Sequence, residues 1–294
     1  MAGTKYAYVK NFELPDPLLP NTFIVLRVDG HAFHRFTDTH TFAKPNDERG
    51  LLLMDHAARA VMEEYKDIVL GFGESDEFSF LLRRSTSMYN RRESKILTTL
   101  VSHFTAFYIF YWSTYFPDTP LQYPPTFDGR LVLYPSQKEV KDYFAWRQAD
   151  THINNLYNTV FWALVQQGGQ TTTEAHATLR GTISSQKHEI LFTRFGVNYN
   201  ALPSRYRKGS VLLREIDLGT EFVSHHSPLL ENAHVAVNNS ENTFPLDLVA
   251  DSPGLGETNF RATKKRRKAV VQVLHDDIIS DEFWEKRPML LNGE

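Results

Sequence analysis

The spacing of apolar residues along the first 135 positions predicts alternating strands and helices. Four short runs are rich in β-forming residues, and two longer segments carry apolar positions at helical spacing. The predicted strands are 23–28, 67–72, 77–83 and 126–134, and the predicted helices are about 46–65 and 89–112. The tight connection Gly73-Glu74-Ser75-Asp76 joins the second and third strands as a hairpin. The predicted order is therefore βαββαβ.

This order is typical of the α+β ferredoxin-like split βαβ fold, in which strands one and two run parallel on either side of strand three. Strand three is antiparallel to both, so the carboxyl end of strand one lies beside the amino end of strand three. Strand one is expected to end at a turn, Asp29-Gly30, and strand three begins beside Asp76 and Glu77. We therefore expect Asp29 to lie close to these two acids.

After residue 135 the pattern becomes mostly helical. The predicted elements are helices 137–167, 173–179 and 184–195 and a strand 210–216, and the polar run 152–155 is expected to interrupt the first helix. Beyond about residue 219 the signals weaken, and 252–257 is expected to be a loop. We therefore divide the chain into a catalytic region, 1–135, and a helical extension with a tail, 136–294, which could pack as one compact unit.

The composition narrows the possible chemistry. The 294 residues include no cysteine, which excludes disulfides, cysteine-ligated zinc and thiol catalysis. No apolar stretch approaches the about 20 residues of a membrane span, and the amino terminus lacks the features of a secretory signal. We expect a soluble protein of the cytoplasm, the nucleus or both, without a membrane partner.

A formal charge of −3 at pH 7 indicates that any contact with nucleic acid is local. The basic residues cluster in three places. These are Arg91-Arg92 with Lys95, Arg205-Tyr206-Arg207-Lys208, and 264–268. Each cluster by itself is also compatible with an ordinary solvated surface.

Two aspartates at adjacent strand ends suit phosphoryl transfer by paired magnesium ions, which need oxygen ligands that hold them ~3.5–4 Å apart. Asp29 and Asp76 are the predicted ligands. Gly30 has no Cβ, so its carbonyl can face a metal while nearby amides approach a triphosphate. Asp29-Gly30 alone would also fit an ordinary turn, and Ser75-Asp76-Glu77 alone would fit a polar hairpin tip. A metal site is favoured because both segments are expected at the same end of one sheet.

The phosphates must be held without a P-loop, since no GxxxxGK[ST] motif is present, and Gly71-Phe72-Gly73 lacks the third glycine of a dinucleotide fingerprint. His31-Ala32-Phe33-His34 is the predicted cradle. Lys44, in a loop that follows this cradle, is the favoured partner of a phosphate, and Arg92 and Lys95 are further candidates.

Three segments resemble the signatures of the tRNA(His) guanylyltransferase family. They are Asp29 to Phe36 (DGHAFHRF), Gly71 to Glu77 (GFGESDE) and His152 to Asn158 (HINNLYN), and the resemblance extends from near the amino terminus to about residue 220. It implies a palm-like domain akin to those of polymerases, with Asp29, the Gly30 carbonyl and Asp76 as magnesium ligands and Glu77 as a supporting acid.

The same resemblance implies the substrates. ATP would activate the 5′-monophosphate of tRNA(His), the 3′-hydroxyl of GTP would attack it, and pyrophosphate would then be removed. The expected nucleotide contacts are Asp29, Gly30, His31, Ala32, Phe33, His34, Lys44, Ser75, Asp76, Arg92 and Lys95. Since the family selects its tRNA by the anticodon, the expected tRNA contacts are His152, Lys187, Asn198, Arg205, Arg207 and Lys208. Family members are homotetramers.

Two other functions are compatible with the residues. A palm-type nucleotide cyclase would use the same topology and the same acids to release a cyclic product without RNA. A non-catalytic RNA-binding protein is the other alternative, which the presence of both predicted metal aspartates disfavours.

Overall fold

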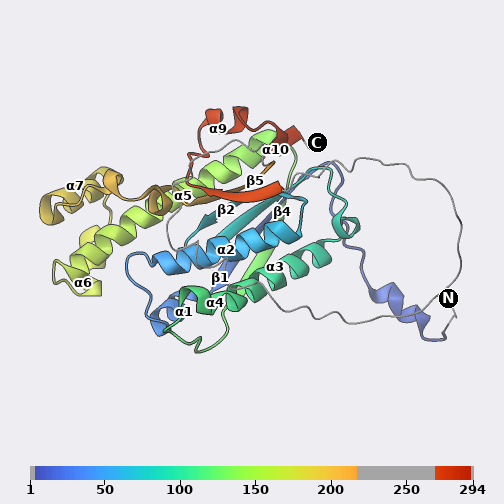
Figure 1. The fold of residues 1–294 in the computed structure, drawn as a ribbon, viewed down its shortest axis with the longest axis horizontal. Helices are drawn as coiled ribbons and strands as arrows, with labels where there is room; N and C mark the ends of the chain where they lie inside the picture. The colour runs from blue at the N-terminus through green and yellow to red at the C-terminus, as the bar shows by residue number, and fades with distance from the viewer. Residues whose placement is uncertain (1–3, 217–268, 293–294) are drawn as a thin grey trace, which may run out of the picture. The chain divides into compact units, whose positions relative to one another are not determined.

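The computed structural model describes residues 4–216 and 269–292, and the described residues up to Glu215 and from Val271 form one compact unit. Its centre is a six-stranded sheet in the order β4-β1-β3-β2-β5-β6 (Figure 1). The strands are β1 Phe23–His31, β2 Ile68–Glu74, β3 Glu77–Leu82, β4 Thr126–Tyr134, β5 Ser210–Ile216 and β6 Ala269–Leu274. β3 is antiparallel to both β1 and β2, so the predicted placement of the first two strands on either side of the third is confirmed.

Helices cover both faces of this sheet (Figure 1). The α-helices are α1 Phe33–Thr39, α2 Glu48–Glu64, α3 Glu93–Phe110, α4 Trp112–Tyr115, α5 Gln137–Gln166, α6 Thr172–Leu179, α7 Ser184–Phe195, α8 Ser204–Lys208, α9 Asp281–Glu285 and α10 Met289–Asn292. Short 3-10 helices are η1 Ala7–Phe12, η2 Met88–Arg91 and η3 Tyr199–Ala201.

Alternate residues of each strand supply two separate cores, because successive side chains of a strand point to opposite faces. Leu26 of β1 packs with α2 and α3 on one face. Val25, its neighbour, packs on the other face with the first turns of α5 and with Trp284 of α9. The central strands are therefore buried on both sides, whereas the edge strands β4 and β6 also have exposed residues along their length.

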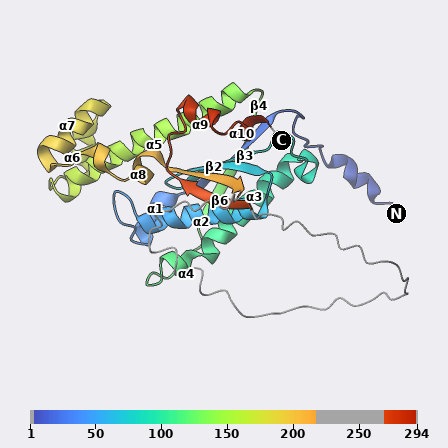
Figure 2. The ribbon, with the colours of Figure 1, turned by 45° about the horizontal axis from the view of Figure 1, so that its top comes forward.

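The long helix α5 runs past the sheet, and α6 and α7 pack against its far half around a third core (Figure 2). Its 30 residues correspond to a length of about 45 Å. The predicted interruption at 152–155 is wrong, because α5 continues through these residues. Within the run only Asn155 is buried, and its Nδ2 donates a hydrogen bond to Tyr199, whereas Ile153 and Asn154 are exposed.

Other boundaries also differ from the prediction. β1 does not stop in a turn at Asp29-Gly30 but continues to His31, because β4 pairs with it through Asp29↔Asp128 and His31↔Thr126. The helix predicted from residue 89 begins at Glu93, since three consecutive residues, 89–91, adopt positive φ angles.

The helix 184–195 and the strand 210–216 have the predicted limits. The structure adds β6, α9 and α10, which the weak signals after residue 219 did not reveal. The predicted loop 252–257 and the basic run 264–268 lie outside the described residues. Among the residues that are described, no helix is long and apolar enough to cross a membrane.

Candidate active site

A tight two-residue turn joins β2 and β3 into a hairpin. Glu74 pairs with Glu77 across the two strands, so only Ser75 and Asp76 form the turn, and Ser75 has a φ of 50°. The carbonyl oxygen of Asp76 accepts a hydrogen bond of 3.1 Å from the amide of Gly30. Because Asp29 is the register partner of Glu77, the structure brings these acids to one end of the sheet, as the topology predicted.

Burial and like charge set the electrostatics of this cluster. Burial raises the pKa of Asp76, and the negative charge of Asp29 raises it further. Burial also raises the pKa of Glu77 to about 7, although the positive charges of Arg147 and Arg27 oppose the shift. The guanidinium of Arg27 lies 2.9 Å from Asp29 Oδ2 and 2.6 Å from Glu77 Oε2. Glu77 is thus held between arginines, whereas no ion pair within the described residues involves Asp76.

The donors at this end of the sheet fit a hard divalent cation. Asp29 and Asp76 supply carboxylate oxygens, and a Cβ placed on Gly30 would lie 2.9 Å from Asp76 Oδ2, so only glycine leaves this space open. Across the described ranges, no group of three or more His, Cys, Asp or Glu residues forms a metal cluster. The chain therefore offers a partial ligand set, which suits magnesium because that ion keeps water and substrate phosphates as ligands.

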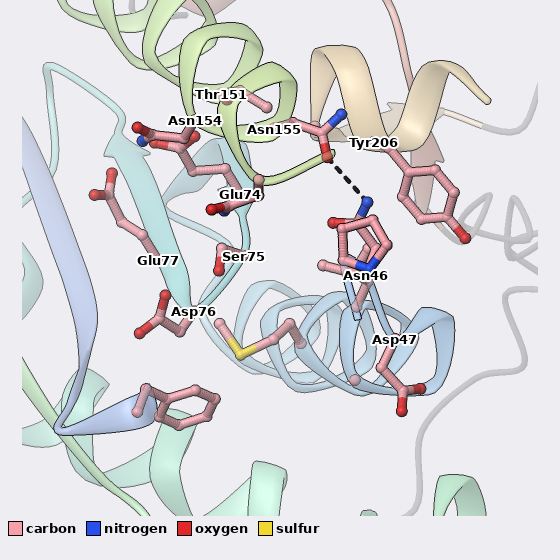
Figure 3. A pocket seen from close by; sticks show the side chains of 18 of the residues that line it. Asn46, Asp47, Glu74, Ser75, Asp76, Glu77, Thr151, Asn154, Asn155 and Tyr206 are labelled. Atoms are coloured by element: carbon pink, nitrogen blue, oxygen red, sulfur yellow. Dashed lines mark hydrogen bonds between the residues drawn. The ribbon is translucent and has the colours of Figure 1, made fainter. Parts of the chain in front are cut away.

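Beside these acids lies a cavity of about 830 Å³, which α2, α5, α8 and the hairpin line (Figure 3). Figure 3 shows Glu74, Ser75, Asp76 and Glu77 along one side and Asn46, Asp47 and Tyr206 along another. Of the predicted nucleotide contacts, Asp29, Phe33, His34, Lys44, Ser75 and Asp76 line it. The set of lining residues does not include Gly30, His31 or Ala32, and Ala32 has a φ of 54° immediately before α1.

Lys44 reaches the cavity from the loop before α2. Its Nζ lies 3.0 Å from Asp38 Oδ1, donates a hydrogen bond of 3.3 Å to Thr37 Oγ1, and lies 5.8 Å from the centre of the Trp162 ring. Three partners from two directions hold the ammonium group at the cavity wall. The ammonium group of Lys44 is therefore held in position at the wall of the cavity that the acids also line.

Arg92 and Lys95 are not brought to this cavity. They lie at the start of α3, which follows the opposite end of β3 from Asp76. Arg92 Nε lies 3.0 Å from Asp16 Oδ1, and the same carboxylate accepts a hydrogen bond of 2.9 Å from the amide of Ser94. Lys95 is exposed. The charge of Arg92 is thus satisfied locally.

The predicted tRNA contacts divide into two groups. His152, Lys187 and Asn198 lie on or next to α5 and α7, and the His152 ring is 5.4 Å from that of Tyr199. Burial lowers the pKa of His152, with the positive charges of His188 and Arg207 adding to the shift.

Residues of α8 form the second group. Arg205 lines the cavity and pairs with the buried Asp55 at 3.0 Å, and Arg207 donates a hydrogen bond of 2.8 Å to the carbonyl of Leu202. Lys208 lies 3.7 Å from Asp277. These side chains therefore already have protein partners.

The sequence prediction missed several residues of this site. Arg147, Asp150 and Asn46 line the cavity, and Arg147 contacts three carboxylates. Glu74 stands inside the recognised segment GFGESDE and could have been proposed from it. Arg147 carries no local signal, because an arginine within an amphipathic helix is usually a solvated residue.

Comparison with known proteins gives full-length matches. The family model described as tRNAHis guanylyltransferase matches residues 6–135, and the one described as Thg1 C terminal domain matches 138–280. The chain is 48% identical over 299 residues to the tRNA(His) guanylyltransferase of Neurospora crassa, covering 100% of this chain and 97% of that protein. It is 47% identical over 291 residues to the probable tRNA(His) guanylyltransferase of Dictyostelium discoideum, covering 99% of each.

Solved structures agree with these matches. The crystal structure of tRNA(His) guanylyltransferase from Saccharomyces cerevisiae superposes with a TM-score of 0.69 and 48% identity, covering 71% of this chain and 93% of that one. A bacterial tRNA(His) guanylyltransferase-like protein in complex with ATP, 24% identical, shares the fold with a TM-score of 0.59 over 79% of this chain and 94% of that chain.

Proposed function

The chain belongs to the tRNA(His) guanylyltransferase family, and we propose that it adds a guanylate to the 5′ end of tRNA(His) in the 3′-to-5′ direction. The relatives that match it over nearly their whole length are named as this nucleotidyltransferase or as a probable one. The observation that carries the proposal is the pairing of β1 with the β2–β3 hairpin, which sets Asp29 beside Asp76 at the edge of a cavity large enough for a nucleotide.

The reaction has three chemical steps. The 5′-phosphate of the tRNA attacks the α-phosphorus of ATP, and pyrophosphate leaves. The 3′-hydroxyl of GTP then attacks the activated phosphorus, and AMP leaves. Water then attacks the α-phosphorus of the added nucleotide, and loss of pyrophosphate leaves a 5′-monophosphate and completes the addition of one guanylate.

Within the chain, Asp29, Asp76 and the Gly30 carbonyl would hold magnesium, which when bound would offset the charge that develops on the reacting phosphates. Lys44 is placed to pair with a phosphate, because its ammonium lines the same cavity. Ser75 and His34 are the further phosphate contacts that we propose there. Glu77 acts as a supporting acid, since two arginines occupy its carboxylate.

We further propose that the sheet is a ferredoxin-like palm of the kind found in polymerases and cyclases. The strand order β4-β1-β3-β2 and the position of the acids at one end support this assignment. Residues 1–135 would supply the catalytic acids, and the extension from residue 136 would supply α5 as the opposite wall. A triphosphate bound by Arg92 and Lys95 would be separate from the one beside Asp76, because these residues lie away from the cavity.

The tRNA contacts that we propose are His152, Lys187, Asn198, Arg205, Arg207 and Lys208. A homotetramer would allow one subunit to read the anticodon while another receives the acceptor end. We place the reaction in the cytoplasm, the nucleus or both.

The decisive experiment uses purified protein with magnesium, ATP, labelled GTP and 5′-monophosphorylated tRNA(His), beside the same mixture with tRNA(Phe). Label at the 5′ end of tRNA(His) alone is the expected result. Label on both RNAs would contradict the proposed selectivity. A cyclic product from GTP with no labelled RNA would replace the proposal with a cyclase, and the absence of any triphosphate turnover would favour a non-catalytic RNA-binding protein.

A further inference from the structure

Arg147 of α5 contacts carboxylates on both sides of the hairpin turn. Its side chain is only 3% exposed, and its Nη2 donates a hydrogen bond of 2.6 Å to Glu74 Oε1. Its Nε lies 2.9 Å from Glu77 Oε1 as an ion pair, and Nη2 also donates to Asp150 Oδ2 at 2.6 Å. One guanidinium thus spans the last residue of β2 and the first residue of β3.

The hairpin needs such a cation. Glu74 and Glu77 face each other as the closing pair of the two strands, and like charges directly opposite on a sheet repel. Both side chains are less than a tenth exposed, so water screens the repulsion weakly. Arg27 reaches Glu77 from β1, whereas within the described residues Arg147 is the only cation that pairs with Glu74.

The position of the hairpin tip depends on the spacing of Glu74 and Glu77. The turn between the two glutamates consists only of Ser75 and Asp76, so a change in the spacing of Glu74 and Glu77 moves Asp76 directly. The planar guanidinium can contact both glutamates at once, which a lysine ammonium at one point cannot do with the same geometry. α5 is anchored to the sheet by its apolar first turns, which fixes Arg147 in turn.

We propose that Arg147 is a positioning residue for the reaction: it clamps the Glu74–Glu77 pair and so fixes Asp76 beside Asp29 for divalent-cation binding. This role rests on the proposed function where turnover is the readout. It does not require Arg147 to touch either substrate.

The test compares Arg147→Met and Arg147→Lys with the wild type in the full chain. Hydrogen exchange of residues 73–78 without metal or substrate should be about tenfold faster in Arg147→Met. The dissociation constant of Mn²⁺ alone should rise about tenfold, as is typical when a group that orients a metal ligand is lost. The magnesium concentration for half-maximal guanylate transfer should rise similarly, with Arg147→Lys recovering part of each effect.

Arg91→Met is the matched control. Arg91 is an arginine that is partly buried, less so than Arg147, and it donates to the carbonyls of Leu18, Leu19 and Thr22 away from the cavity. Its loss should lower the melting temperature but leave Mn²⁺ affinity and hairpin exchange unchanged. If Arg147→Met does not fold, Arg147→Met with Glu74→Gln removes one of the opposed charges and should restore folding but not the Mn²⁺ affinity.

Hairpin exchange and Mn²⁺ affinity equal to those of the wild type in folded Arg147→Met would overturn the positioning role. A wild-type protein that binds Mn²⁺ through the hairpin yet transfers no guanylate would refute the proposed function instead. The two failures are therefore distinguishable.

Discussion

Asn46 Nδ2 donates a hydrogen bond of 2.9 Å to Asn155 Oδ1, which joins the loop before α2 to the middle of α5 (Figure 3). The same Asn155 donates through Nδ2 to the hydroxyl of Tyr199 at 3.0 Å. The third recognised segment therefore connects the loop that carries Lys44 to the helical extension. The side chain of Asn155 therefore has a structural role within the cavity wall.

Asn155→Ala should lower both stability and nucleotide affinity. It removes the acceptor of the partly buried Asn46 amide and one of the two partners of the buried Tyr199 hydroxyl, which costs about 1–3 kcal/mol, and it frees the loop that holds Lys44. We expect the KM for nucleotide to rise several-fold in steady-state assays. Tyr199→Phe is the control, because it removes the hydroxyl bonds to Asn155 and to the carbonyl of His152 but leaves the Asn46–Asn155 bond, and it should lower the melting temperature without raising the KM.

Asp29→Asn or Asp76→Asn should reduce guanylate transfer by about 10³-fold or more, or about 4 kcal/mol of transition-state stabilisation, because each removes a proposed metal ligand. Single-turnover rates measure the loss, and tRNA affinity and circular dichroism should stay close to those of the wild type. Asp142→Asn, an exposed carboxylate of α5 paired with Lys138, should have no effect. Full activity in either metal-site variant would refute the two-metal mechanism.

Gly30→Ala should displace Asp76. The added Cβ would lie 2.4 Å from Phe33 Cδ2 and 2.9 Å from Asp76 Oδ2, so at least one of them must move. We expect turnover to fall at least tenfold and Mn²⁺ to bind more weakly. Gly181→Ala is the control: its φ of 73° makes alanine cost about 1 kcal/mol, but nothing lies within 4 Å of the new methyl group, so turnover should be unchanged.

Stability should depend on pH through Asp55. Burial raises the pKa of Asp55 from 3.8 to about 6, despite the opposing charge of Arg205. A raised pKa means that the folded state binds the proton more tightly, so the contribution of Asp55 to stability is greatest below about pH 4, falls as the pH rises to about 6, and is then constant. The fall amounts to about 3 kcal/mol.

Denaturant unfolding between pH 4 and 7 checks this dependence. Asp55→Asn should show a smaller fall in that range, and the fall that remains reflects Glu77, whose pKa burial also raises, to about 7. Ser210→Ala, which removes a hydrogen bond of 3.0 Å to Asp55 Oδ2, should extend it to higher pH. The same pH dependence in Asp55→Asn as in the wild type would assign it to other groups.

His152→Ala should weaken discrimination between tRNA(His) and tRNA(Phe) more than it slows guanylate transfer to bound tRNA. The pKa of His152 is lowered, so its ring is neutral at pH 7, and its contribution should not change between pH 7 and 8. Competition assays with the two RNAs measure the discrimination. His103→Ala, on α3 beside Tyr65, serves as the control. Equal losses for both RNAs would indicate a role in folding or catalysis.

The sequence determined the local elements and one decisive juxtaposition. The spacing of the apolar residues predicted the strands and the long helices, because the buried face of each segment is visible in the sequence of that segment alone. The order of these segments then required β1 and β2 to flank β3, and this brought Asp29 to Glu77 across the sheet. The boundary at Asp29 could not be predicted, because it depends on pairing with β4 about a hundred residues later.

The tertiary structure decided which charges are available. Arg92 and Lys44 each pair with an aspartate, Asp16 and Asp38, but Lys44 lines the cavity whereas Arg92 lies away from it. The role of Arg147 could not be predicted from its own helix, because Glu74 and Glu77 lie on a hairpin about seventy residues earlier and only Asp150 is a partner within the helix. Ion pairs between distant segments depend on how the helices pack on the sheet, and local periodicity carries no information about that packing.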